Sequence, residues 1–489
     1  MRLALAGHHP RGARAALQPL RGRLAVRSRS GRCAPGSGVS RARLPPVNIV
    51  GAGLAGALLA LLLARRGIAA TLHERRPDPR QAAPERGRSI NLALAARGMR
   101  ALERAGVMER VRPLLIPMRG RMVHEPTGQT ALQPYGQREH EVIWSVGRAD
   151  LNRVLIEEAA RHAGVEVRFS QLCLGADAPR DRLRLRDEAS GAEREIALTP
   201  TIATDGAGSA LRVSLATAGF LSVREDWLDH DYRELTVPPV AGAHTLEPYA
   251  LHIWPRGGFM LIALPNTDGS FTATLFLARR GEKSFAALRT PEAVAGFFNR
   301  EFPDAVPLMP DLLSQFAGHP QGQLGTVHAT PWQIEGRVLL LGDAAHAIVP
   351  FHGQGMNAAF EDCTVLDELI GHGGEWEAVF GEFERLRRPN TEAIAQMALE
   401  NYGEMRDAVL DADFLRRRQI ALGLERRFPD RFIPRYSMVM FHPEIPYAEA
   451  LRRGAVQAQL LDELDRGPGV EPDARLAEQL VRERLPPIG

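Results

Sequence analysis

The chain has 489 residues, 45% of them hydrophobic and 24% charged, which is enough to bury a large core in one multi-segment domain or in two to three smaller ones. No run approaches the roughly 18 apolar residues of a membrane-spanning helix, and three cysteines without a CxxC pair indicate neither a disulfide framework nor a metal site. The formal charge of +3 misleads, because residues 1–46 hold ten arginines and no acidic residue; subtracting these ten from 61 basic residues leaves 51 against 58 acidic ones, a net of −7. We therefore expect no nucleic-acid partner.

Residues 1–46 form an Arg-rich leader that contains serines and lacks acidic residues, a composition that is typical of organelle transit peptides. A disordered or wrongly assigned extension ahead of a true start near Val47 is the alternative that we favour. Lys283 is the only lysine of the chain, and this preference for arginine is typical of GC-rich coding sequence, which can produce such leaders.

The next stretch, VNIVGAGLAGALLALLLARRGIAATLHERR at 47–76, predicts a βαβ unit that ends at Glu74. Gly51, Gly53 and Gly56 form a GxGxxG motif between the first strand and the helix. The first glycine permits a tight turn, the second lets the backbone approach a pyrophosphate, and the third lets helix and strand pack closely. Glu74 is placed to accept hydrogen bonds from a ribose diol. The motif predicts a bound dinucleotide, NAD(P) or FAD, without choosing between them.

Later stretches predict further helices and strands, among which residues 250–277 differ from the helix–strand alternation. Asp150 is predicted to cap a helix over residues 151–163, LNRVLIEEAARHA. Short strand-like runs within residues 250–277, separated by turn compositions, predict an antiparallel sheet. Residues 336–343, GRVLLLGD, predict a buried parallel strand, and residues 356–370 predict a helix before a mostly helical end of the chain.

The predicted fold class is α/β, with a nucleotide-binding domain built from discontinuous segments, an inserted antiparallel β-sheet and a helical C-terminal region. The expected boundaries are 47–115, 145–220 and 325–385 for the nucleotide-binding domain, 116–144 and 221–324 for the substrate-binding sheet domain, and 386–489 for the helical region.

Two further motifs follow predicted strands. TDGAGSALR at 204–212 places Asp205 at a strand end, and GDAAHAIVPFHGQGMN at 342–357 does the same for Asp343. In their order after GxGxxG, the motifs DGxxSxxR and GDAAHxxxPxxGQGxN resemble those of the group A flavoprotein aromatic hydroxylases. The resemblance implies a GR2-type, Rossmann-like FAD-binding domain of the aromatic hydroxylase fold, with FAD as the bound nucleotide.

The resemblance also implies how the segment between Asp343 and the helix at Met356, called the flavin loop below, works. Asp343 would meet hydroxyls of the FAD ribityl chain or ribose. Gly353 and Gly355 would let the backbone pass close to a flat ring. The helix that begins at Met356 would turn its positive end toward reduced flavin, which is anionic near N1. Asn357 would bond the flavin edge or cap the helix.

Four more stretches, GRSINLALAARG at 87–98, MRGRMVH at 118–124, HIWPRGGFMLIALPN at 252–266 and RYSMVMFH at 435–442, narrow the resemblance to the kynurenine 3-monooxygenase family. The likeness runs from Val47 to about Arg453. The implied cofactor contacts are Gly51, Gly53, Ala55, Gly56, Glu74, Arg75, Ala93, Arg148, Asp205, Asp343, Gly355, Met356 and Asn357.

The same resemblance implies substrate contacts at Arg121, Tyr135, Asn401 and Tyr436, where a guanidinium and phenols would hold the carboxylate of an α-amino acid. Without it, ordinary ion pairs and core phenols would be the preferred interpretation. Pro350 and Phe351 would wall the ring, and His352 is a candidate for lining the active site, with no obligatory acid or base assigned. His346 is expected to be structural.

The implied reaction starts with reduction of FAD by NADPH, followed by addition of O2 to give a flavin C4a-hydroperoxide that hydroxylates L-kynurenine at ring position 3. This step of tryptophan catabolism leads toward quinolinate and NAD. The aniline nitrogen already activates the ring, so a dry pocket matters more than an acid–base pair. The chain has no second GxGxxG for NADPH and no counterpart of the C-terminal membrane anchor of eukaryotic relatives, so we expect a soluble, cytoplasmic, bacterial-type enzyme. The oligomeric state is left open.

Two rival hypotheses remain. One is a related flavin hydroxylase of a phenolic or aminobenzoate substrate, with the same FAD motifs around a different pocket. The other is a protein that binds FAD without catalysing a reaction. A flavin halogenase is disfavoured, because the WxWxIP stretch and the lysine expected after GxGxxG are absent.

Overall fold

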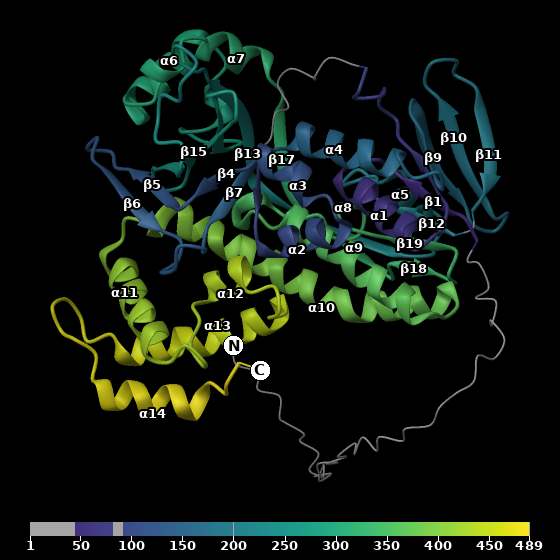
Figure 1. Ribbon diagram of the computed structural model, residues 1–489. Helices are drawn as coiled ribbons and strands as arrows, with labels where there is room; N and C mark the ends of the chain where they lie inside the picture. Colours follow the sequence, from purple (N-terminus) through teal and green to yellow (C-terminus); the bar gives the residue numbers. More distant parts are fainter. Residues whose placement is uncertain (1–44, 82–90, 199, 489) are drawn as a thin grey trace, which may run out of the picture. The chain divides into compact units, whose positions relative to one another are not determined.

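The computed structural model describes residues 45–81, 91–198 and 200–488 (Figure 1). The leader expected over residues 1–46 lies outside them, apart from Pro45 and Pro46. None of the helices in these three ranges combines the length and the apolar character that crossing a bilayer requires.

The nucleotide-binding part is a six-stranded sheet with the order β18-β19-β12-β1-β2-β8, parallel except for the antiparallel edge strand β18. The strands are β1 (Val47–Val50), β2 (Ala70–His73), β8 (Val165–Arg168), β12 (Thr201–Ala203), β18 (Gln333–Ile334) and β19 (Val338–Leu340). β1, α1 (Leu54–Arg65) and β2 form the predicted βαβ unit, which is confirmed. Helix α1 is apolar almost all round because it is buried against the sheet and against two other helices, α4 (Arg148–Ala160) and α9 (Gly355–His372).

The start of α4 differs from the prediction. The helix begins at Arg148, directly after β7 (Ile143–Gly147), and its N-cap is Gly147 rather than Asp150. Asp150 lies in the first turn, where a carboxylate still favours the positive helix end, and it pairs with Arg153 at 3.1 Å. The capping prediction was wrong because the extended backbone of Gly147 lets strand pass into helix without a polar cap.

A second, seven-stranded sheet has the order β17-β13-β16-β15-β14-β5-β6. Its strands are β5 (Gly120–His124), β6 (Thr130–Pro134), β13 (Ser222–Val237), β14 (Leu251–Pro255), β15 (Met260–Pro265), β16 (Phe271–Ala278) and β17 (Gln321–Thr330). The predicted antiparallel arrangement of β14, β15 and β16 is confirmed, whereas β5 joins β14 in parallel. Helices α6 (Pro291–Glu301) and α7 (Leu312–Gly318) cover one face of this sheet (Figure 1), which leaves the other face for a cavity.

Smaller elements complete the core. A three-stranded sheet has the order β3-β7-β4, with β3 at Asn91–Leu94 and β4 at Ile116–Met118, and another is formed by β9 (Gln171–Asp177), β10 (Arg182–Asp187) and β11 (Glu193–Ala197). The shorter helices are α2 (Ala96–Ala105), α3 (Met108–Val111), α5 (Ala210–Thr217), α8 (Asp343–His346) and the 3-10 turns η1 (Arg112–Leu114), η2 (Phe285–Ala287), η3 (Val306–Leu308) and η4 (Pro350–His352).

The last third of the chain is helical, as predicted. Its elements are α10 (Trp376–Gly403), the π-helical turn η5 (Glu404–Ala408), α11 (Ala412–Arg427), α12 (Arg435–Phe441), α13 (Tyr447–Leu464) and α14 (Ala474–Arg484). Helix α10 packs on both α9 and α13, so the C-terminal helices are joined to the helix that follows the flavin loop. A π-helical turn inserted after a long helix is a frequent mark of a functional site.

Candidate active site

The glycine turn after β1 shows which glycines the protein itself requires. Gly51 has φ +96°, and a Cβ added to Gly56 would lie 2.0 Å from the Gly51 carbonyl oxygen. Both positions therefore need glycine for the chain to fold. A Cβ on Gly53 would meet no described atom within 4 Å, yet Gly53 lines the main cavity. Free space over the start of a helix fits a bound phosphate.

Glu74 at the end of β2 is fixed beside this turn. Its Oε2 accepts a hydrogen bond from Ala52 N at 2.8 Å, and its Oε1 accepts from Arg76 N at 3.0 Å and Arg76 Nε at 2.8 Å. Burial alone would raise the pKa of Glu74, but the contacts with Arg76 and Ala52 lower it, so the carboxylate is ionised. Its contact with a ribose stays a prediction, as does that of Arg75, which is exposed and is not among the residues of the cavity wall.

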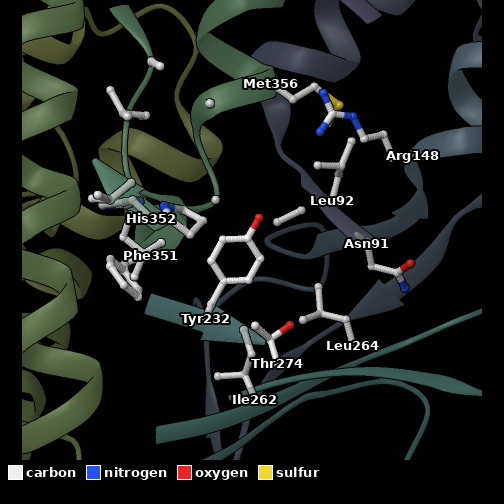
Figure 2. Close-up of a pocket in the computed structure, with 18 of the residues that line it drawn as sticks. Asn91, Leu92, Arg148, Tyr232, Ile262, Leu264, Thr274, Phe351, His352 and Met356 are labelled. Atoms are coloured by element: carbon white, nitrogen blue, oxygen red, sulfur yellow. The ribbon is translucent and has the colours of Figure 1, made fainter. Parts of the chain in front are cut away.

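The main cavity has a volume of about 410 Å³ and lies between the two large sheets and the loop after β19. The predicted cofactor residues on its wall are Gly53, Ala55, Ala93, Arg148, Asp343, Gly355 and Met356. Figure 2 shows Arg148 and Met356 among the residues of this wall, and Tyr232 and Thr274 projecting from the seven-stranded sheet. The cavity therefore joins the flavin motifs to the sheet expected to hold substrate.

Two predicted cofactor residues, Asp205 and Asn357, lie behind the wall. Asp205 Oδ2 accepts a hydrogen bond from Ala210 N at 2.8 Å, while its buried Oδ1 has no partner in the part of the chain that the structure describes. Burial raises the pKa of Asp205. A buried carboxylate oxygen beside the wall residue Gly206 fits a hydroxyl donated by a ligand, so the residues present are compatible with FAD.

Asn357 braces the flavin loop. Its Nδ2 donates to the carbonyls of Ala93 and Gly353, each at 2.8 Å, and its Oδ1 accepts from Ala95 N at 2.9 Å. Asn357 does not cap the helix, because α9 begins at Gly355 with Gln354 as its N-cap. Both of its amide protons are used within the protein to hold the loop, and its flavin contact stays a prediction.

A buried ionic cluster holds the strand end that presents Asp343. Asp362 Oδ2 accepts from Gly342 N at 3.1 Å and lies 2.6 Å from His346 Nε2, while Asp362 Oδ1 accepts from Arg387 Nε at 2.6 Å. Burial alone would raise the pKa of Asp362, but His346 and Arg387 lower it to about 2. His346 is thus structural, as predicted.

The predicted substrate residues meet at one place. The Arg121 guanidinium carbon lies 5.0 Å from the ring centroid of Tyr436 and 5.8 Å from that of Tyr135, and the two rings stack with centroids 5.7 Å apart. Arg121 Nη1 is 3.4 Å from Oε1 of Glu404. Burial alone would lower the pKa of Arg121, but the two phenols and Glu404 raise it, so a charged, buried guanidinium faces the site.

A second cavity of about 370 Å³ adjoins the main one. Both cavities are lined by Arg121, Tyr135, His352 and Tyr436, which therefore form a shared wall. Asn401 lines the second cavity, and its Nδ2 donates to the Phe351 carbonyl at 2.6 Å. The structure thus places Asn401 against the flavin loop, at the edge of the shared wall.

His352 belongs to this wall in a neutral form. Burial lowers its pKa to about 3, and its ring stacks on Tyr436 with centroids 5.2 Å apart. Its Nδ1 is buried and has no partner among the described residues. Pro350 and Phe351 also line the main cavity, and their predicted contact with a ring stays a prediction.

Sequence reasoning missed Glu404 and Tyr402. Glu404 opens the π-helical turn and supplies the carboxylate beside Arg121. Tyr402 stacks under Phe351 with centroids 3.8 Å apart. Both stand in NYGEM, the run in which only Asn401 was singled out, so a carboxylate three residues after that asparagine was the available signal.

Comparison with known proteins agrees with this geometry. The family model described as "FAD binding domain" matches residues 45–374. A kynurenine 3-monooxygenase of Myxococcus xanthus is 46% identical over 453 residues, which cover 92% of this chain and 97% of the relative. Another, of Stenotrophomonas maltophilia, is 49% identical over 416 residues, or 85% of this chain and 91% of that protein.

Two solved structures share the fold. 2-Methyl-3-hydroxypyridine-5-carboxylic acid oxygenase has a TM-score of 0.60 at 19% identity, covering 75% of this chain and 93% of that one. PqsL of P. aeruginosa, solved with 2-aminobenzoylacetate, has a TM-score of 0.59 at 20% identity, covering 74% and 97%. At these identities the likeness concerns the fold alone.

Proposed function

The chain belongs to the kynurenine 3-monooxygenase family, and from this premise we propose that its two adjoining cavities hold L-kynurenine across the shared wall. It catalyses the FAD-dependent hydroxylation of L-kynurenine at ring position 3, with NADPH as reductant and O2 as co-substrate. The aromatic ring lies in the main cavity, and the α-amino acid group lies at Arg121.

The observation that carries the proposal is a buried guanidinium that lies over two stacked phenol rings, with a carboxylate within 3.4 Å of it. Arg121 offers a planar fork for the substrate carboxylate, and the hydroxyls of Tyr135 and Tyr436 are directed donors beside it. Glu404, 3.4 Å from Arg121, is a partner for the substrate ammonium. Opposite charges set side by side match a zwitterion better than they match a simple phenol.

The ring end of the site positions the substrate and excludes water. Phe351 rests on Tyr402, and Asn401 fixes the Phe351 carbonyl, so this wall is rigid. Rigid placement of a reacting ring contributes to rate through orientation. Neutral His352 adds no competing positive charge near the carboxylate. The aniline nitrogen of the substrate itself activates the ring, which makes a protein base at that atom unnecessary.

FAD would be held by the Gly53 turn, Asp343, Arg148 and the start of α9 at Gly355, all on the wall of the main cavity. When bound and reduced by NADPH, it supplies the activated oxygen that enters the substrate ring. The N-terminal amides of α9 favour negative charge where they face the cavity. The chain's own contribution is thus an apolar wall for the substrate ring at Pro350 and Phe351 and a charged clamp at Arg121 and Glu404.

The domain division remains part of the proposal. β5, from segment 116–144, pairs with β6 of the same segment and with β14 of segment 221–324 in one sheet, which supports grouping the two segments. β4 pairs with β7 in a different sheet, which favours a boundary just after Met118.

Product analysis tests the function. The purified protein is supplied with L-kynurenine, NADPH and ¹⁸O2, and we expect 3-hydroxykynurenine that carries one labelled oxygen. Hydroxylation of a phenolic acid or an aminobenzoate, with kynurenine untouched, would contradict the substrate assignment. Flavin that NADPH never bleaches in the absence of oxygen would instead indicate a protein without catalysis.

A further inference from the structure

A buried chain of hydrogen bonds lies on the face of the seven-stranded sheet opposite the cavity. Asp304 Oδ2 is 3.0 Å from His124 Nδ1, His124 Nε2 is 2.9 Å from His252 Nδ1, and His252 Nε2 is 2.8 Å from the Glu247 carbonyl oxygen. His124 ends β5, His252 belongs to β14, and Asp304 follows α6. The exposed fractions of the two histidines are 5% and 1%, so water does not complete their hydrogen bonds.

The two groups at the ends of this row of hydrogen bonds, Asp304 and the Glu247 carbonyl, fix the number of protons within it. A carboxylate and a carbonyl oxygen both accept hydrogen bonds, so each of the three gaps between them needs a hydrogen. Two neutral imidazoles supply only two of these three hydrogens. The third proton must sit on an imidazole, making it an imidazolium, or on Asp304.

The surroundings favour the imidazolium. Asp304 Oδ2 also accepts a hydrogen bond from Trp254 Nε1 at 2.7 Å, and the side chain of Asp304 is 32% exposed. Burial alone would raise the pKa of Asp304, but the contacts with His124 and Trp254 lower it. Burial lowers the pKa of His252 to about 4, so His252 is neutral and the extra proton belongs to His124.

We propose that His124 carries both ring protons in the native protein and that this charged link between β5, β14 and the loop after α6 positions Arg121. The part that concerns Arg121 rests on the proposed function; the proton count does not. Trp254 supports a cation at His124, because its ring stacks on the imidazole with centroids 4.0 Å apart.

Other charged groups around His124 leave Asp304 as its counter-ion. Arg256, on the turn after β14, donates from Nη1 to the His124 carbonyl at 3.0 Å and from Nε to the Glu301 carbonyl at 2.6 Å. Its guanidinium is therefore held by main-chain oxygens. Glu247 contacts His252 through its carbonyl oxygen, while its carboxylate accepts a hydrogen bond from Tyr249 N.

The hydrogen bonds of His124 affect the position of Arg121 because both residues belong to β5. Side chains alternate along β5, so Arg121 and Val123 face the cavity while His124 faces α6. Arg121 pairs with Leu251 of β14, next to His252. Removing one proton leaves two acceptors facing each other across a gap of about 3 Å. That gap must open, and β5 then moves with Arg121 on it.

Ring-nitrogen NMR tests the proton count directly. Protein with ¹⁵N-labelled histidine rings is titrated with pH, and His124→Gln and His252→Gln assign the two signals. We expect both nitrogens of His124 to be protonated at neutral pH and one nitrogen of His252 to be bare. A His124 ring with one bare nitrogen at neutral pH would overturn the proposal, because the third proton would then sit on His252 or on Asp304.

A second measurement tests the positioning role. The KM for kynurenine of the wild-type enzyme should rise about fivefold, the effect of losing one hydrogen bond. This rise should occur over the pH range in which NMR shows His124 losing its proton, and kcat should change little. Asp304→Asn keeps both rings and should move that rise to lower pH, whereas His372→Gln, at the exposed end of α9, should leave it in place.

An unchanged pH profile in Asp304→Asn would overturn the positioning role even if His124→Gln fails to fold. Wild-type protein that turns over no kynurenine would refute the proposed function instead, and the nitrogen spectrum would still decide the proton count.

Discussion

Tyr135 and Tyr436 stack with ring centroids 5.7 Å apart and planes 16° apart. One follows β6 of the seven-stranded sheet, and the other lies in α12 of the C-terminal helices. Their contact joins two parts of the chain at the shared wall of the cavities, and Arg121 lies over both rings. Binding of an amino acid there depends on the C-terminal helices as well as on the FAD-binding segments.

Arg121→Lys should raise the KM for kynurenine by about 30- to 100-fold, which corresponds to roughly 2–3 kcal/mol for a lost bidentate, charge-assisted pair. A lysine keeps the charge but cannot offer the fork. Steady-state kinetics and the flavin absorbance of the purified variant are the measurements. Arg119→Lys is the matched control, because Arg119 is an exposed neighbour that lies over Tyr249, and its KM should stay unchanged. Loss of flavin from Arg121→Lys would mean that Arg121 supports the cofactor instead.

Tyr436→Phe should weaken kynurenine binding about fivefold, the contribution of one hydroxyl of roughly 1 kcal/mol. The ring and its stacks on Tyr135 and His352 are kept, so the melting temperature should not change. Titration of substrate against flavin fluorescence measures the affinity, and calorimetry measures the melting temperature. An unchanged affinity would show that the phenol acts through packing alone.

The glycine turn separates folding from cofactor binding. Gly56→Ala should give little folded protein, because its Cβ would lie 2.0 Å from a backbone oxygen. Gly53→Ala should fold, because Gly53 has φ −69° and free space around it, yet it should bind FAD more weakly because the methyl group enters the cavity. Flavin content and the melting temperature of the apoprotein distinguish the two. Gly381→Ala, inside α10 with open space around it, is the control and should be slightly more stable. Full flavin occupancy in Gly53→Ala would place the phosphates elsewhere.

Asp362 makes folding stability depend on acid pH. Its pKa is about 2 in the folded protein against an ordinary 3.8, and a lowered pKa contributes stability that is present above the ordinary value and is lost as pH falls through the folded one. We expect a contribution of about 2 kcal/mol at neutral pH that disappears between about pH 4 and pH 2.

The Asp362→Asn variant should therefore have a lower free energy of unfolding at neutral pH and a shallower loss below pH 4, measured by denaturant titration across pH. Asp226→Asn, a change at an exposed carboxylate, is the control and should behave like the wild type. If the free energy of unfolding falls by the same amount below pH 4 in Asp362→Asn and in the wild type, the result would contradict the assignment.

The sequence was sufficient for features that depend on neighbouring residues. The βαβ unit, the buried strand before Asp343 and the helix after the flavin loop were predicted because periodicity and glycine requirements act over a few residues. Gly51 with its positive φ is one case. The resemblance to a family then supplied Arg121, Tyr135 and Tyr436, which the structure brings together.

The start of α4 at Arg148, the carboxylate of Glu404 beside Arg121, and the His124–His252 pair emerged only from the tertiary structure. Each depends on where the folded chain places residues: β7 runs straight into α4, η5 meets β5, and β5 lies next to β14. A polar side chain has no defined partner until the chain folds, and burial then makes that partner obligatory. For this reason the sequence determined the scaffold and its nucleotide turn, whereas the charges that face the substrate were decided by packing between distant segments.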